Sequence, residues 1–364
     1  MRIGIDGHMI GDHSGGNESY YTNILKEMPV SKDDDVYLFL KKNVDATLYA
    51  HKYKIIWFNS KNSFARNFFE LPHLCRKYQL DLLHTQYFIP FNRPCKVVCT
   101  IHDICFEHYK DIFTKKEYWR QKLLIPYAAK HSSYIFTVSE NAKQDIQHTY
   151  GIPSEKIIVT YNAVNKKFRK MESDELNESD LRDKYQIGSA EYILSVGNLQ
   201  PRKNLPRLIE AFIQFKNKSG SDTKLVIVGK KAWLYDDIIS KALGTSKDVI
   251  LTGYVEDEDL VRLYNAAKCF VYPSFFEGFG IPPLEAMACG TPVAVSKSTS
   301  LPEVVGDAGQ YFDPFSTDEI EKSIEMMLNK RFDEDLYDKM CKQVNKFSWI
   351  KTAEIIYNTY RNVK

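Results

Sequence analysis

The residues best suited to chemistry gather in the last third of the chain. The segment 275–292 holds two glutamates, Glu277 and Glu285, with seven residues between them, among which are Gly278 and Gly280. A carboxylate only accepts hydrogen bonds, so two of them reaching one ligand from different directions suit a molecule with many hydroxyl groups. The glycines let backbone N–H groups come close to the same ligand. The segment therefore indicates a site for a polyhydroxyl compound.

Two adjacent cations form a second feature. Arg202 and Lys203 follow a predicted strand that ends at Gly197, and a helix is expected to begin beside them. Positive charge at the start of a helix opposes the helix dipole, and an anion bound between the two side chains would relieve that repulsion. The pair therefore predicts a phosphate clamp.

The first half of the chain contributes a histidine and a glycine loop. His102 follows the apolar run 97–101 and can donate a hydrogen bond or move a proton. All nine histidines lie at or before His148, so any imidazole in a shared site must come from this half. Gly15 and Gly16 precede a predicted helix, but neither GxGxxG nor GxxxxGK[ST] occurs there, and a flexible turn explains these glycines equally well.

Strands and helices alternate along almost the whole chain, which is typical of α/β proteins. Strands are predicted at Arg2–Asp6, Val36–Leu40, Lys54–Phe58, Asp81–His84, Lys96–His102, Ser133–Ser139, Lys156–Tyr161, Tyr192–Val196, Lys224–Val228, Asp248–Thr252, Cys269–Tyr272 and Pro292–Val295. A polar stretch, 166–183, interrupts the alternation and marks a boundary between domains 1–168 and 187–345. We therefore expect two doubly wound, Rossmann-like domains with parallel sheets, whose strand ends face a cleft that holds the ligand.

Composition narrows the class of protein. Hydrophobic residues make up 44% and charged residues 26%, which is ordinary for a globular protein, and no apolar run approaches the roughly 20 residues of a membrane span. The start of the chain lacks a secretory signal, and the odd number of cysteines favours reduced thiols, so we expect a cytoplasmic protein. Residues 51–168 hold 18 Lys and Arg against 9 Asp and Glu, a basic excess that would attract an anionic substrate or membrane surface.

These motifs together resemble the retaining family 4 glycosyltransferases (glycosyltransferase group 1) of the GT-B fold. The resemblance rests on Glu277 to Glu285 with its Gly-Thr-Pro ending, on 197–204, on His102-Asp103 and on Gly15-Gly16, and it runs over nearly the whole chain. It implies an acceptor-binding first domain and a donor-binding second domain, with a helix in 346–364 that packs back on the first.

The resemblance also implies a role for each residue. Glu285 would hold the ribose of a nucleoside diphosphate sugar, Glu277 and the 278–280 amides would hold the sugar, Arg202 and Lys203 would neutralise the diphosphate, and His102 would contact the transferred sugar. The implied donor-binding residues are Gly15, Gly16, Gly197, Arg202, Lys203, Glu277, Gly278, Phe279, Gly280, Ile281 and Glu285. His102, Arg202, Lys203 and Glu277 would act in catalysis, with Glu277 as nucleophile a minor alternative. Many relatives carry arginine where this chain has Asn198, so the clamp would rest on Arg202 and Lys203 alone.

No cofactor or metal is expected. The acidic pairs Asp33/Asp35 and Asp257/Asp259 match a short metal-binding pattern, but both lie in polar runs where acids serve as turn or first-turn residues. The cations of the clamp would take the place of a metal, so activity should survive EDTA.

The expected reaction is transfer of a hexose, from a UDP-hexose first and GDP-mannose next, to a saccharide or lipid-linked saccharide in polysaccharide or cell-envelope synthesis. The basic and aromatic stretch 115–125 suggests peripheral contact with an anionic membrane at its inner face, although a helix packed on its sheet explains it as well. No nucleic-acid partner is expected. The alternatives are a nucleotide-sugar epimerase or phosphorylase on the same fold, an NAD-dependent oxidoreductase, and a binding protein with a decayed site.

Overall fold

The computed structural model describes residues 1–12, 15–230, 247–329 and 334–363, and it divides into two compact units. The first unit is Met1–Asn162 with Ser348–Lys364, and the second is Ala163–Phe347. The polar stretch 166–183, on which the sequence places the domain boundary, lies inside the second unit. There it forms most of two short helices, α7 (Ser173–Leu176) and α8 (Glu178–Lys184).

The first unit is built on a seven-stranded sheet in the order β3-β2-β1-β4-β5-β6-β7, with every neighbouring pair parallel. The strands are β1 (Arg2–Asp6), β2 (Asp35–Leu40), β3 (Lys54–Trp57), β4 (Leu82–Gln86), β5 (Lys96–Thr100), β6 (Ile135–Thr137) and β7 (Ile157–Val159). The register sets Ile3 beside Val36 on one side and Leu82 on the other. These inner strands are apolar on both faces because helices cover both faces of a parallel sheet.

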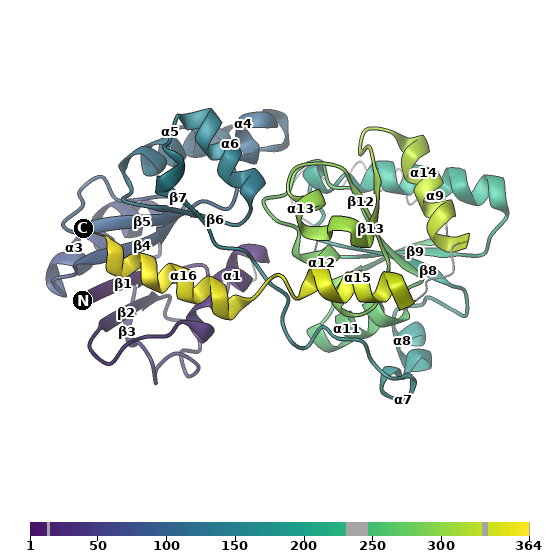
Figure 1. The fold of residues 1–364 in the computed structure, drawn as a ribbon, viewed down its shortest axis with the longest axis horizontal. Helices are drawn as coiled ribbons and strands as arrows, with labels where there is room; N and C mark the ends of the chain where they lie inside the picture. The colour runs from purple at the N-terminus through teal and green to yellow at the C-terminus, as the bar shows by residue number, and fades with distance from the viewer. Residues whose placement is uncertain (13–14, 231–246, 330–333, 364) are drawn as a thin grey trace. The chain divides into compact units, whose positions relative to one another are not determined.

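Helices of the first unit come from both ends of the chain. They are α1 (Gly16–Glu27), α2 (Ser63–Ala65), α3 (Leu71–Lys77), α4 (Cys105–His108), α5 (Lys115–His131), α6 (Glu140–Tyr150) and α16 (Trp349–Asn362), with a π-helical turn at Arg66–Glu70 and 3-10 turns at Lys110–Ile112 and Ser154–Lys156. α16 lies beside α1 (Figure 1). Its Thr352 hydroxyl donates to the Tyr161 carbonyl at 2.6 Å, and its buried Tyr360 contacts the His84 ring.

The second unit is built on a six-stranded parallel sheet in the order β10-β9-β8-β11-β12-β13. The strands are β8 (Tyr192–Val196), β9 (Lys224–Val228), β10 (Val249–Gly253), β11 (Cys269–Tyr272), β12 (Val293–Ser296) and β13 (Gly309–Phe312). The sequence analysis missed β13, which lies at the edge of the sheet and is only partly buried apart from Phe312. An edge strand lacks the continuous apolar run that identifies a strand covered on both faces.

The other helices of this unit, among the described residues, pack on the sheet or on one another. They are α9 (Leu205–Ser219), α11 (Asp257–Ala266), α12 (Ile281–Ala288), α13 (Leu301–Val305), α14 (Thr317–Asn329) and α15 (Glu334–Val344), with 3-10 turns at Pro201–Lys203 and Gly306–Ala308. α9 and α14 pack side by side (Figure 1) and share a core with the sheet through Phe212, Ile324 and Val271.

Strand order fixes where loops can meet. In each sheet the chain starts at an inner strand, fills one side and then the other, so β1 and β4 flank one switch point and β8 and β11 flank the other. Loops that leave the carboxyl ends of such neighbouring strands diverge and leave room for a ligand. Across the described residues, no helix combines the length and the apolar character that crossing a membrane requires.

Candidate active site

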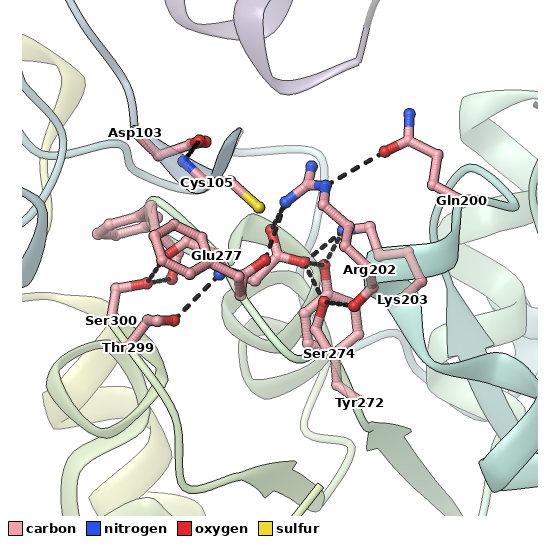
Figure 2. Close-up of polar contacts among 12 residues, drawn as sticks. Asp103, Cys105, Gln200, Arg202, Lys203, Tyr272, Ser274, Glu277, Thr299 and Ser300 are labelled. Atoms are coloured by element: carbon pink, nitrogen blue, oxygen red, sulfur yellow. Dashed lines mark hydrogen bonds and ion pairs between the residues drawn. The ribbon is translucent and has the colours of Figure 1, made fainter. Parts of the chain in front are cut away.

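The loops after β8 and β11 bring the predicted cations and one predicted carboxylate together (Figure 2). Lys203 Nζ lies 2.6 Å from Glu277 Oε1, and Arg202 Nη1 lies 2.8 Å from Glu277 Oε2. Each carboxylate oxygen therefore accepts from a different cation. The two motifs are more than seventy residues apart in sequence but meet because their strands are neighbours at the switch point.

Glu277 is held in its ionised form. Tyr272 and Ser274 also donate to Oε1, so the buried carboxylate accepts hydrogen bonds from four of the described side chains. Burial alone would raise its pKa, but the charges of Arg202 and Lys203 and the hydrogen bonds outweigh burial and lower the pKa to about 2. Such a carboxylate is a poor proton acceptor and a weak nucleophile.

The clamp residues occupy a 3-10 turn rather than the start of α9. Pro201–Lys203 forms that turn, and α9 begins two residues later at Leu205, so the predicted helix does begin beside the two cations, which lie just before it. Lys203 is buried to 8% exposure and its stem passes Gly197, where an added Cβ would lie 3.2 Å from Lys203 Cε. Arg202 is more open and also donates to the Phe276 carbonyl. The cations are thus placed by contacts with the opposite loop.

The loop of Gly278 and Gly280 is anchored by the segment that follows the neighbouring strand β12. Ser300 donates to the Glu277 carbonyl at 2.9 Å and to the Phe279 carbonyl at 2.7 Å, while the Glu277 N–H donates to Thr299 Oγ1. Gly280 has φ of +105°, and a Cβ there would lie 2.6 Å from a Leu301 methyl group, so only glycine fits. α12 begins directly after it, at Ile281.

Pro282 and Pro283 predict the start of a short helix with Glu285 in its first turn, but the structure places Glu285 one turn further into α12. The helix begins at Ile281, one residue before Pro282, which sets Glu285 in the second turn. Its Oε2 accepts from the Tyr264 hydroxyl at 3.1 Å. Burial raises the pKa of Glu285 to about 7, whereas the pKa of Glu277 is lowered to about 2, so the two carboxyl groups are shifted in opposite directions. Tyr272 connects them, because it donates to Glu277 and its own pKa is raised by burial and, in addition, by the charges of both glutamates.

Comparisons with known proteins identify the family of the chain. Residues 14–168 match the model described as Glycosyltransferase Family 4, and residues 177–347 match Glycosyl transferases group 1. The chain is 35% identical over 297 residues to the O-antigen chain mannosyltransferase B of Escherichia coli, covering 79% of this chain and 75% of that protein. It belongs to the family 4 glycosyltransferases.

One further relative is much longer than this chain, and one solved structure shares its fold. The serotype-specific mannosyltransferase WbdA of Escherichia coli is 33% identical over 273 residues, which are 72% of this chain but only 33% of that longer protein. The crystal structure of Anabaena Alr3699/HepE in complex with UDP and glucose covers all of both chains with a TM-score of 0.75 at 19% identity. This glycosyltransferase therefore has the GT-B fold, and membership of the family removes the oxidoreductase alternative.

The first-unit residues of the predicted site lie at the carboxyl edge of their own sheet. His102 follows β5, is buried, and contacts the Gln86 side chain from the end of β4. Burial lowers the pKa of His102 to about 3, so its imidazole is neutral at pH 7. Gly15 and Gly16 are exposed, with φ of +74° at Gly15 directly before α1.

Three of the four acids considered as metal ligands form ion pairs with lysines. Lys54 pairs with Asp35, Lys167 pairs with Asp257, and Lys184 pairs with Asp259. Asp257 and Asp259 do lie in the first turn of α11, as the sequence predicts. Within the described part of the chain, no three His, Cys, Asp or Glu side chains are grouped as metal ligands. Metal independence of this glycosyltransferase stays a prediction.

Sequence reasoning missed the residues that hold the cluster in place. Tyr272 and Ser274 lie directly before the predicted loop 275–292, so their place in the sequence could have indicated them. Thr299 and Ser300 follow β12, where no sequence motif marks them. Gly229 was also missed. A Cβ there would lie 2.1 Å from the Gly197 carbonyl oxygen, so glycine at 229 lets β9 pass close to the loop that carries the clamp.

Proposed function

We propose that this family 4 glycosyltransferase transfers mannose from GDP-mannose, with retention of configuration, to a saccharide or lipid-linked saccharide in cell-envelope polysaccharide synthesis. The observation that carries the chemistry is the cluster of Glu277, Arg202 and Lys203 at the β8/β11 switch point. Support for mannose comes from the names of the relatives, O-antigen chain mannosyltransferase B and WbdA. These names reverse the order in which the sequence ranked the donors, UDP-hexose first.

The cluster suits a diphosphate leaving group. Two cations against one carboxylate leave one net positive charge, and Arg202 keeps part of its guanidinium open to solvent. Negative charge grows on the departing diphosphate as the sugar–oxygen bond breaks, so fixed cations stabilise the transition state more than the bound donor. A diphosphate that binds Arg202 and Lys203 would replace Glu277 as their partner. The Glu277 oxygens could then accept hydrogen bonds from sugar hydroxyls.

Retention follows most simply from attack on the face that the diphosphate leaves. The acceptor oxygen forms the new bond to the sugar carbon, the electron pair of the broken bond goes to the diphosphate oxygen, and a phosphate oxygen takes the acceptor proton. The low pKa of Glu277 and its four donors argue against a covalent intermediate on that residue. Neutral His102 would serve as a hydrogen-bond partner of the transferred sugar, and Glu285 would accept from the ribose hydroxyls.

A donor panel tests the proposal. Calorimetry and thermal shift with GDP, GDP-mannose, UDP, UDP-glucose and UDP-GlcNAc should show binding of the GDP pair, and a ligand at 100 times its Kd adds roughly 2.7 kcal/mol to the free energy of unfolding. Arg202→Ala combined with Lys203→Ala should abolish that gain. The control is Arg169→Ala combined with Lys268→Ala, which removes two cations of partly exposed ion pairs in the same unit.

Transfer itself is then followed with an acceptor saccharide. NMR of the product should show the anomeric configuration of GDP-mannose, and EDTA should leave the rate unchanged. Binding of the UDP series alone would restore the first donor ranking, and an inverted product or loss of activity on chelation that Mg²⁺ or Mn²⁺ restores would contradict the mechanism.

A further inference from the structure

Two phenylalanine rings lie at the edge of the second sheet where its strands end. Phe275 follows β11 and Phe315 follows β13, and their rings stack with centroids 4.9 Å apart and planes inclined by 18°. Phe315 is 58% exposed, and because Phe275 covers one face of its ring, the exposed area lies on the other face and the edges. Single exposed rings are common on proteins, but a stacked pair with an open face is typical of a ligand site.

Arg207, in the first turn of α9, packs against both rings. Its guanidinium carbon lies 5.6 Å from the Phe275 centroid and 5.9 Å from the Phe315 centroid. Its Nη1 donates to the Asn204 side chain at 3.1 Å and to the Pro314 carbonyl at 3.0 Å, and among the described residues no carboxylate pairs with this arginine. The N–H groups on Nε and Nη2 therefore remain for a ligand. We call Phe275, Phe315 and Arg207 the ring platform.

Hydrogen bonds of the backbone hold both rings in place. The Phe275 N–H donates to the Arg202 carbonyl at 2.9 Å, and the Phe315 N–H donates to Asp313 Oδ1 at 2.9 Å. Asn204 connects the two segments, because its side-chain amide donates to a carbonyl in each. A surface that is already ordered loses less conformational freedom when it binds a ligand. The bond to Arg202 also joins the ring platform to the phosphate clamp.

The ring platform and Glu285 belong to opposite faces of the second sheet. Val271 of β11 packs in the core with α9 and α14, whereas its neighbour Phe270 points to the other face and contacts Tyr264 of α11 at 5.6 Å. Tyr264 in turn donates to Glu285 of α12. Since the ring platform lies at the starts of α9 and α14, the chain crosses the edge of the sheet between the platform and α12, and Glu277 lies on that crossing.

We propose that the ring platform binds a sugar of the acceptor chain, behind the sugar that receives the transferred hexose. This inference rests on the proposed function, in which the ribose reaches Glu285 and the diphosphate reaches the clamp. The donor then occupies the α12 side of Glu277 and leaves the platform side to the acceptor. The axial C–H groups of a pyranose form a flat apolar face that packs on an aromatic ring, and its hydroxyls can accept from the guanidinium of Arg207.

The size of the ring platform suits a sugar better than a protein. A stable protein interface covers about 800 Å² on each partner, which is far more than two rings present. Polar and charged side chains lie in the same turns, among them Asp313, Thr317 and Glu210. Such surroundings favour a ligand with hydroxyl groups over a purely apolar one.

The test is saccharide binding to the full chain without nucleotide, measured by saturation-transfer NMR and calorimetry. The probes are linear tetrasaccharides of mannose, glucose, galactose and N-acetylglucosamine. At least one should bind, and Phe315→Ala should weaken its binding roughly tenfold through the loss of one stacked ring. Phe315→Trp should keep the affinity, and its emission should change as the saccharide is added. The control is Met326→Ala, which removes another exposed apolar side chain, from α14.

Transfer kinetics give a second readout. With the donor saturating, Phe315→Ala should raise KM for the tetrasaccharide roughly tenfold and leave kcat nearly unchanged, because the ring binds ground state and transition state alike. The rise in KM should be smaller for a methyl mannoside, which is too short to reach the ring platform from the reacting centre.

No binding of any tetrasaccharide by the wild type, or equal binding by Phe315→Ala, would overturn the proposal. Weaker GDP binding in this variant with unchanged saccharide binding would assign the ring platform to the nucleobase and overturn it as well. GDP calorimetry on the wild type separates the two proposals. Intact GDP binding without saccharide binding contradicts the ring platform alone, whereas saccharide binding without GDP binding contradicts the proposed donor.

Discussion

Glu285 is the site residue whose charge changes near neutral pH. Its pKa is raised from an ordinary 4.5 to about 7 by burial, so the carboxyl is about half protonated at pH 7. Both oxygens of the ionised carboxylate can accept from ribose hydroxyls. The protonated carboxyl carries an O–H group on one oxygen, so it accepts from the ribose less well. Donor affinity should therefore rise as pH increases from about 6 to 8, which calorimetry across that range measures.

Glu285→Gln separates this effect from stability. The folded state holds the Glu285 proton more tightly than the unfolded chain, so the free energy of unfolding falls as pH rises from about 4.5 to 7. The variant should lose that dependence, unfold at a higher temperature at pH 8, and bind donor roughly 10- to 100-fold more weakly. Unchanged donor affinity in the variant would show that Glu285 does not contact the donor.

At the scale of elements, Asn204 joins the clamp turn to α9. Its φ of +56° is left-handed, and its Nδ2 donates to the carbonyls of Pro273 at 3.1 Å and Pro314 at 2.7 Å. The residue thereby connects the end of β11 with the segment before α14.

Asn204→Ala should destabilise the second unit by about 2–4 kcal/mol. The buried Pro273 carbonyl would lose this donor, although Arg207 still donates to the Pro314 carbonyl, and alanine at positive φ adds about 1 kcal/mol of strain. Asn204→Gly should lose the hydrogen bonds without the strain. Urea unfolding of both variants checks this, and equal stability of the two would contradict the strain argument.

Much of the fold was readable from the sequence at this scale. Strands buried on both faces, such as β8 and β9, were predicted to the residue because their apolar runs are continuous. The edge strand β13, the 3-10 turn at 201–203 and the second-turn position of Glu285 were not, since each depends on tertiary packing. Arg202 and Lys203 were predicted as a phosphate clamp and Glu277 as a sugar ligand, but their ion pairs with one another and the hydroxyl donors of Glu277 depend on which strands are neighbours.

At the scale of the whole molecule, α16 ties the end of the described chain to the first unit. Its Tyr357 hydroxyl accepts from the Ser31 N–H at 2.8 Å and also bonds Asp34, and Tyr360 is fully buried beside His84. Removing residues 348–364 would expose the face of α1 whose Tyr20 packs against Trp349.

Truncation after Phe347 should therefore abolish cooperative unfolding of the first unit and leave the second unit folded. Differential scanning calorimetry should show one remaining transition, which the bound nucleoside diphosphate still raises. The control is Ile355→Ser in the full chain, which keeps α16 in place. A truncated protein that retains both transitions would show that α16 is dispensable.

The return of α16 also sets an order of assembly during translation. The first unit is interrupted by the whole of Ala163–Phe347, so the ribosome finishes the second unit before it delivers the helix that completes the first. The roughly 200 residues after Asn162 take on the order of 10–40 s to synthesise. For that time the α16-binding face of α1 is exposed on the nascent first unit and can aggregate. A premature stop after residue 347 would leave that face exposed permanently, so it should be more damaging in the cell than the loss of one helix suggests.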